Sequence, residues 1–350
     1  MRYATYLEKT DHEQFSLGSS PRGLANVHMS CWVVVTDAAG NTYNVMRAIQ
    51  ADDLCKSMHF GVYRGRDVLD ESSAFFIPFT EVPVVVPFAT SSSPESVVYS
   101  GQGFDLELFA DRTVWNEANG RVQIEATQLG DVCSLYVPSQ HPHPHDFVFR
   151  SYFGKAAGTI DGEAVEGLYQ MDSVFSTPAL NMREAGWTDH VHQYWLNWLV
   201  EYEDGTYEGG HAFRGMPGTE FTAGHHVVDG RSTARHDMAL EFDRTSRGTI
   251  SAVRLAVGDD VAFEFEQRGS FDWPIHTFGE VASTTRDKKV RRSWNYMETF
   301  PHNWGEVERY NAAHHDLFGR YPSLRGMLEG AVVRDERIEW DAPRSPEAKS

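Results

Sequence analysis

One stretch of the sequence places an acid and an imidazole directly before a run of aromatic residues. The segment Gly186-Trp187-Thr188-Asp189-His190 leads into a strand-like stretch over 194–198 that is rich in Tyr and Trp. A carboxyl group among indole and phenol rings is poorly solvated, which disfavours its charged form and raises its pKa. Such a group can keep its proton near neutral pH and donate it, and a neighbouring histidine can orient or recharge it. Asp189 is therefore the candidate general acid, and His190 is its candidate partner.

Aromatic residues beside an acid can pack a core or line a ligand cavity, and ring faces attract cations without reacting with them. The candidate substrate-binding residues lie on the strand after Asp189, on the last strand of the second half and at the end of the first half: Tyr194, Trp195, Trp198, Trp294, Tyr296, Glu298 and Asp172.

A purely structural interpretation of the same residues stays open. Asp189 would then cap a turn and His190 would pack in a domain interface. The residues at 294, 296 and 298 would pack as ordinary core or sheet residues.

Histidines are numerous, so a metal site has to be weighed. His141, His143 and His145 alternate with prolines that hold the chain extended, which is also typical of a proline-rich surface loop. Elsewhere the histidines come in pairs, at 190 and 192 and at 225 and 226, and the spacing supplies no third ligand. We therefore expect neither a metal nor a cofactor. His211, Arg214 and His276 are weaker site candidates.

Nucleotide-dependent and serine-hydrolase chemistry have no support in the sequence. Gly101-Gln102-Gly103 does not continue as a dinucleotide fingerprint, no P-loop surrounds Gly154-Lys155, and no GxSxG motif occurs. The net charge of −19 disfavours nucleic acid and anionic lipid surfaces as partners. We expect a hydrophobic small molecule as the partner instead, and the oligomeric state is left open.

The expected cellular location is inferred from the hydrophobic segments and cysteine motifs that the sequence lacks. The start of the chain is hydrophilic, and no stretch of 18 apolar residues could span a membrane. Cys31, Cys55 and Cys133 are odd in number and show no CxxC spacing, which is typical of free thiols in a reducing compartment. The expected location is the cytoplasm.

The dominant pattern along the chain is apolar–polar alternation between turn residues, which predicts antiparallel strands. Strands over 31–35 and 42–45 flank a Gly-containing loop, and strands over 192–202 and 206–213 flank Glu203-Asp204-Gly205. Another hairpin should span 157–172 through the Asp161-Gly162 turn. The fold class is therefore all-β, mostly antiparallel, in two barrel or sandwich domains.

A break in the alternation marks a domain boundary, and the C-terminal part of the chain departs from the strand pattern. The alternation breaks near 174–188, so we predict an N-terminal domain over 1–178 and a C-terminal domain over 179–340. A short C-terminal helix should begin after Asn303 and end at Gly319, and residues 341–350 should form a flexible tail.

The Gly-x-x-Asp-His segment, the Trp-rich strand and the Asp-Gly turn together resemble the start of the second domain in the carotenoid 1,2-hydratase and AttH-like superfamily. The similarity is strongest over 158–215, and the family's usual Trp-Gly after Asp-His is Val191-His192 here. The resemblance implies two lipocalin-like (calycin) β-barrel domains and a cavity for an isoprenoid- or polyketide-like substrate. It also implies that Asp189 protonates an alkene.

Three functional hypotheses follow. The first is a cofactor-independent enzyme that starts hydration, dehydration, isomerisation or cyclisation of an unsaturated apolar molecule by proton transfer. The second is a protein that binds or carries such a molecule unchanged. The third is a pericyclase that acts by shape and needs no acid.

Overall fold

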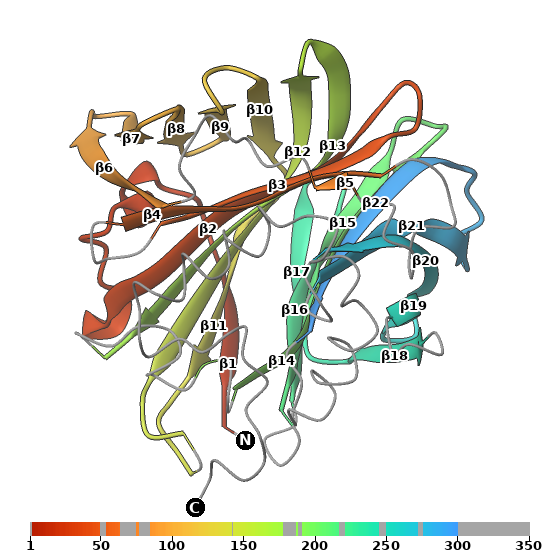
Figure 1. Cartoon of the computed structure of the whole chain (residues 1–350). Helices are drawn as coiled ribbons and strands as arrows, with labels where there is room; N and C mark the ends of the chain where they lie inside the picture. The colour runs from red at the N-terminus through yellow and green to blue at the C-terminus, as the bar shows by residue number, and fades with distance from the viewer. Residues whose placement is uncertain are drawn as a thin grey trace, which may run out of the picture.

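The structure is a computed structural model that describes residues 2–49, 54–63, 75–76, 85–141, 143–177, 187, 191–216, 221–244, 250–271 and 276–299. These residues form antiparallel strands in two curled sheets, one from each half of the chain (Figure 1). The all-β fold class is confirmed. The predicted helix over 303–319 and the tail over 341–350 lie outside the described residues.

The first sheet curls until it meets itself. Its strands pair in the order β1-β11-β12-β10-β9-β8-β7-β6-β4-β3-β2-β13, with β5 on β4, and β12 also pairs with β13 along its whole length. The strands are β1 (Ala4–Glu8), β2 (Ala25–Asp37), β3 (Thr42–Ile49), β4 (Leu54–Tyr63), β5 (Phe75–Phe76), β6 (Val85–Ser92), β7 (Ser96–Gly101), β8 (Phe104–Phe109), β9 (Arg112–Glu117), β10 (Val122–Gln128), β11 (Val132–Val137), β12 (Phe147–Ile160) and β13 (Glu163–Ser176).

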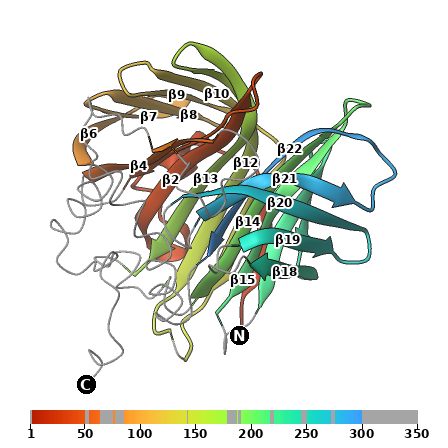
Figure 2. The ribbon, with the colours of Figure 1, turned by 45° about the vertical axis from the view of Figure 1, so that its right-hand side comes forward.

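The second sheet is also a series of neighbouring antiparallel strands, in the order β17-β16-β15-β14-β22-β21-β20-β19-β18. Figure 2 shows it beside the first sheet, with β14 and β22 on the side of β12 and β13. The strands are β14 (His192–Tyr202), β15 (Tyr207–Gly215), β16 (Thr222–Val228), β17 (Arg231–Arg235), β18 (Met238–Arg244), β19 (Ile250–Val257), β20 (Val261–Phe271), β21 (His276–Thr284) and β22 (Val290–Thr299).

The hairpins predicted from alternation are confirmed. β2 pairs with β3, β14 with β15, and β12 with β13. Asp161 and Gly162 join β12 to β13, with φ of 51° and 86°. Positive φ at both central residues is what a type I′ hairpin turn requires, and an Asp-Gly pair adopts it readily. One sheet ends at Ser176 and the other begins at His192, while the exact domain limits stay a prediction.

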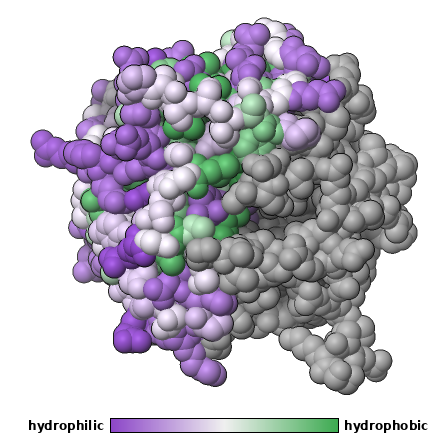
Figure 3. All heavy atoms as spheres, turned by 90° about the vertical axis from the view of Figure 1, so that its left-hand side faces the viewer, coloured by the Kyte–Doolittle hydropathy of each residue, from purple (hydrophilic) through white to green (hydrophobic). Residues whose placement is uncertain are grey.

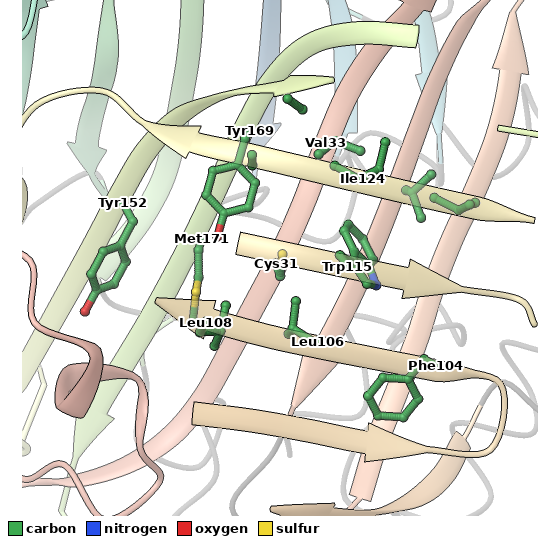
Figure 4. Close-up of a cluster of buried hydrophobic side chains, with 14 of the residues drawn as sticks. Cys31, Val33, Phe104, Leu106, Leu108, Trp115, Ile124, Tyr152, Tyr169 and Met171 are labelled. Atoms are coloured by element: carbon green, nitrogen blue, oxygen red, sulfur yellow. The ribbon is translucent and has the colours of Figure 1, made fainter. Parts of the chain in front are cut away.

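Side-chain alternation gives each sheet two differently used faces. Figure 4 shows the interior of the first sheet, where residues from β2, β8, β9, β10, β12 and β13 point toward one another. A separate cluster fills the curl of the second sheet around Trp198 and Phe265. A third cluster lies between the sheets, and we call this region the junction. The junction cluster includes Trp32, Phe149 and Phe153 from the first sheet, and Trp195, Phe213, Trp294 and Tyr296 from the second.

The two sheets approach closely at the junction. β13 contacts β14 and β22, β2 contacts β22, β12 contacts β15, and β11 contacts β16. At Gly209 on β15, a Cβ atom would lie 2.3 Å from the backbone oxygen of Trp198 on β14 and 2.4 Å from the ring of Phe153 on β12. A glycine there lets β15 approach both the neighbouring strand and the first sheet.

Most large apolar side chains are used inside these clusters. Figure 3 shows one side of the molecule, where hydrophilic residues cover much of the described surface and hydrophobic ones gather in patches between them. Among the residues whose side-chain burial is described, Val228 is the one large hydrophobic residue that is exposed. No helix in that part of the chain is long and apolar enough to cross a membrane.

A buried carboxylate stabilises the second sheet. Glu208 on β15 accepts hydrogen bonds from Tyr202, from Arg286 (Nε to Oε1, 2.9 Å) and from His226, whose Nε2 lies 2.9 Å from Oε2. Burial alone would raise the pKa of Glu208, but the bonds from these three residues outweigh it and lower the pKa to about 2. Its ionised form is therefore more favourable in the folded protein than in the unfolded chain.

We expect this group to make stability depend on pH in acid. A lowered folded-state pKa contributes stability that is present above the unfolded value of 4.5 and is lost as pH falls toward about 2. The loss attributable to Glu208 is at most about 3 kcal/mol. Urea unfolding between pH 5 and pH 2 measures it. Glu208→Gln should flatten this part of the profile, and an unchanged profile in the variant would contradict the assignment.

Candidate active site

The acid and imidazole singled out by the sequence, Asp189 and His190, lie outside the described residues. Trp187 and Val191 on either side of them are described, and both are buried in the junction cluster. The roles of Asp189 and His190 stay predictions.

β14 divides the three aromatic candidates that follow. Trp195 points into the junction, and its ring centroid lies 5.2 Å from that of Trp32 on β2. Tyr194 and Trp198 point to the opposite face, where Trp198 belongs to the core of the second sheet and Tyr194 packs against it. Successive side chains of a strand alternate between its faces. Trp195 therefore cannot share a pocket with Tyr194 or Trp198.

β22 brings the next three candidates to the junction side. Trp294 and Tyr296 belong to the junction cluster, and the ring of Tyr296 lies 4.1 Å from that of Trp32 and 5.9 Å from that of Trp195. Trp294 donates from Nε1 to Thr36 Oγ1 at 3.1 Å, which ties β22 to the first sheet. Glu298 follows on the same face of β22 and is partly exposed.

Asp172 on β13 is the most unusual titratable group of the junction. The residue is only 6% exposed, and its Oδ1 accepts a hydrogen bond from Gln170 Nε2 at 2.8 Å. Burial raises the pKa of this carboxyl well above its usual range, and the negative charge of Glu298 adds to the increase. Hydrogen bonds from Gln170, Ser151 and Trp32 only partly oppose this. Burial thus favours the neutral form of Asp172 over its ionised form.

A chain of polar groups connects Asp172 to the second sheet. Gln170 also donates to Ser151 on β12 and accepts from Asn197 Nδ2 on β14. Asn197 Oδ1 and Trp195 Nε1 are buried and have no hydrogen-bond partner among the residues that the structure describes. Buried polar atoms are normally satisfied, so these two are available to a bound molecule or water.

His192 and Glu298 form a second polar pair near the end of β14. Trp187 donates from Nε1 to His192 Nδ1 at 3.2 Å, and His192 Nε2 lies 3.8 Å from Glu298 Oε2. An indole nitrogen can only donate a hydrogen bond, so Nδ1 of His192 must be the acceptor. In a neutral imidazole the proton then lies on the other nitrogen, Nε2. The imidazole therefore presents an N–H to the carboxylate of Glu298.

Some of these contacts could not be found from the sequence. Trp32, Gln170 and Asn197 carry no motif, and they meet only because β2 and β13 of one sheet pack on β14 and β22 of the other. Alternation does predict that Gln170 and Asp172 share a face of their strand. It does not say which face meets the second sheet.

The histidines at 141 and 143 and Arg214 make no contact with Asp172 in the part of the chain that the structure describes. His141 is exposed, while His143 is buried with Nδ1 3.2 Å from the backbone oxygen of His145. Arg214 lies near the ring of Tyr194, on the far side of β14 from the junction. The side chain of His276 lies outside the described residues.

No family model and no curated protein match the chain. Solved structures do match it. A putative AttH from Nitrosomonas europaea is 11% identical, with a TM-score of 0.45, and the match covers 81% of this chain and 95% of that one. CghA, solved with Sch210972, is 9% identical with a TM-score of 0.40, covering 79% and 89%. Kievitone hydratase from Nectria haematococca is 8% identical with a TM-score of 0.36, covering 84% and 95%.

The first of these structures carries the name AttH, as does the family that the sequence resembles. At identities of 8–11% and TM-scores of 0.36–0.45, these matches assign no family, reaction or substrate to this chain.

Proposed function

We propose that the chain binds an apolar, unsaturated small molecule at the junction and that Asp172 protonates a C=C bond of it. The observation that carries this proposal is a buried carboxyl group, with its pKa raised by burial, beside the aromatic rings of Trp32, Trp195 and Tyr296. A neutral acid in an apolar site can donate a proton at neutral pH, where an exposed carboxylate cannot.

The reaction needs no cofactor, because Asp172 supplies the proton at the start and recovers one at the end. The O–H bond of Asp172 breaks as a C–H bond forms, which leaves a carboxylate and a carbocation. Water can then add to the cation and return a proton to Asp172, which gives a hydrated product. Alternatively, a carbon next to the cation loses a proton to the Asp172 carboxylate, which gives an isomer. A second double bond can also attack the cation, which closes a ring and moves the positive charge to another carbon. Loss of a proton from the carbon next to that charge to Asp172 then gives a cyclic alkene.

The aromatic residues would favour the charged intermediate. Trp32, Trp195 and Tyr296 pack together at the junction, and a cation in contact with a ring face gains about 0.5–2 kcal/mol. The same rings exclude water, which prevents premature capture of the cation.

Asp189 and His190 remain the rival assignment for the proton donor. The sequence places them next to Trp187, which is buried in the junction cluster. Both assignments predict an acid-initiated reaction, and separate variants of Asp172 and Asp189 distinguish them.

The experiment is a screen of linear polyenes and prenylated aromatic compounds in D₂O. Quenching of tryptophan fluorescence identifies the molecules that bind, and mass spectrometry then follows them over time. Proton transfer from an exchanged carboxyl predicts one deuterium on carbon for each turnover. A bound molecule returned unaltered would indicate a carrier, and a cyclised product without carbon-bound deuterium would indicate catalysis by shape. Either result would contradict the proposal.

A further inference from the structure

Three donor groups that the proposed reaction does not use meet at the edge of the junction. Cys133 lies on β11, His211 on β15 and His225 on β16, and all three residues are buried. One potential ligand atom from each lies within 4.8 Å of the others. This is the one group of three or more His, Cys, Asp or Glu side chains so arranged within the described ranges.

The two sheets bring the group together. His211 and His225 are direct cross-strand partners in the β15–β16 ladder, so their side chains leave the same face. Their Nδ1 atoms lie 2.7 Å apart. Cys133 comes from the first sheet, where β11 contacts β16. The sequence spacing of 78 and 14 residues between these positions gives no motif that would reveal the group.

Both imidazoles are in a form that can bind a metal. Both rings are buried, at 2% and 0% exposure, and burial in apolar surroundings favours the neutral imidazole. A neutral imidazole has one nitrogen lone pair available to a metal. His225 Nε2 is also buried without a hydrogen-bond partner among the described residues, so the hydrogen bond between the rings does not satisfy the pair.

We propose that Cys133, His211 and His225 form a binding site for one soft metal ion, and that the ion is Cu(I). Thiolate ligands select Cu(I) and zinc among the common metals, and imidazole suits copper and zinc. On binding, the S–H bond of Cys133 breaks and its proton leaves to solvent. The resulting thiolate neutralises the single positive charge, so the Cu(I) complex is neutral and suited to an apolar site. A Zn²⁺ complex would keep one uncompensated positive charge there, and zinc normally needs a fourth ligand.

The two imidazole nitrogens require only a small adjustment. Two nitrogens that bind one ion at about 2.0–2.1 Å lie roughly 3.3–3.6 Å apart. The imidazoles at 2.7 Å would therefore separate by less than about 1 Å. The bound ion would join β11 of the first sheet to β15 and β16 of the second, so it would also stabilise the junction.

The test uses the full chain, reduced and kept without oxygen. Cu(I) is titrated in competition with a chromogenic chelator, and the metal content is measured after gel filtration. We expect one Cu(I) per chain, and at least about 100-fold weaker binding in Cys133→Ser. Cys31→Ser is the matched control, because Cys31 is equally buried but lies inside the first sheet. Equal affinity of the wild type and Cys133→Ser would overturn the proposal.

Two further measurements keep the test decisive if Cys133→Ser does not fold. X-ray absorption of the copper-loaded wild type should show one sulfur and two nitrogen neighbours, and the absence of a sulfur neighbour would overturn the site. Zn²⁺ is titrated in parallel, and tighter binding of Zn²⁺ than of Cu(I) would overturn the choice of ion. The Cu(I) form should also unfold at a higher temperature than the metal-free protein.

Discussion

Asp172→Asn should reduce turnover of an apolar alkene by about 10²–10⁴-fold, because general acid catalysis contributes an effect of this size. Asparagine has nearly the same shape, and its oxygen can still accept the hydrogen bond from Gln170 that Asp172 Oδ1 accepts. It cannot donate an acidic proton. Ligand affinity should therefore stay within a few-fold, and loss of carbon-bound deuterium in the product is the measurement.

Two companion variants make this result specific. Asp161→Asn removes an exposed carboxylate from the turn of the same sheet and should leave turnover unchanged. Asp189→Asn tests the rival donor. Full activity of Asp172→Asn together with loss of activity in Asp189→Asn would move the acid to Asp189 and refute the role of Asp172.

Glu117→Gln should destabilise the protein by about 3–5 kcal/mol, since it leaves a buried cation without its counter-charge. Arg47 is 0% exposed and Glu117 is 1% exposed, inside the first sheet. Arg47 Nε donates to Glu117 Oε2 at 2.6 Å, and Trp115 Nε1 donates to the same oxygen at 3.3 Å. The guanidinium also lies 3.9 Å from the ring centroid of Phe104. Denaturant unfolding at neutral pH measures the loss.

The control for this effect is a solvent-exposed ion pair on the same protein. Arg121 and Asp161 form a bidentate pair on the same sheet, but both side chains are substantially exposed. Asp161→Asn should therefore cost no more than about 1 kcal/mol. The double variant Glu117→Gln/Arg47→Met should recover most of the stability lost in the single variant, because it removes the uncompensated charge. Equal losses in Glu117→Gln and Asp161→Asn would show that burial is not the cause.

The local part of the fold could be predicted from the sequence. The hairpins β2–β3 and β14–β15 follow from alternation and Gly-containing turns, which depend on residues close together in the chain. Strand β1 was not predicted. It is short and pairs with β11 more than a hundred residues later, so no local pattern marks it.

The candidate site could be predicted only in part. Asp172, Trp195, Trp294 and Tyr296 were all named from the sequence, and the structure places them on the junction side of their strands. Tyr194 and Trp198 were grouped with Trp195 because they are near it in sequence, although alternation puts them on the other face. The cross-sheet contacts of Trp32 and Asn197 depend on how two sheets pack, which no single-strand pattern encodes.

The central claim is that Asp172 keeps its proton at neutral pH, and infrared difference spectroscopy tests it most directly. Spectra of the wild type and Asp172→Asn are compared at pH 7, in H₂O and in D₂O. We predict a protonated-carboxyl C=O band that is present in the wild type, shifts in D₂O and is missing in the variant. A pair of carboxylate bands lost in the variant instead would show that Asp172 is ionised and would contradict its role as the proton donor.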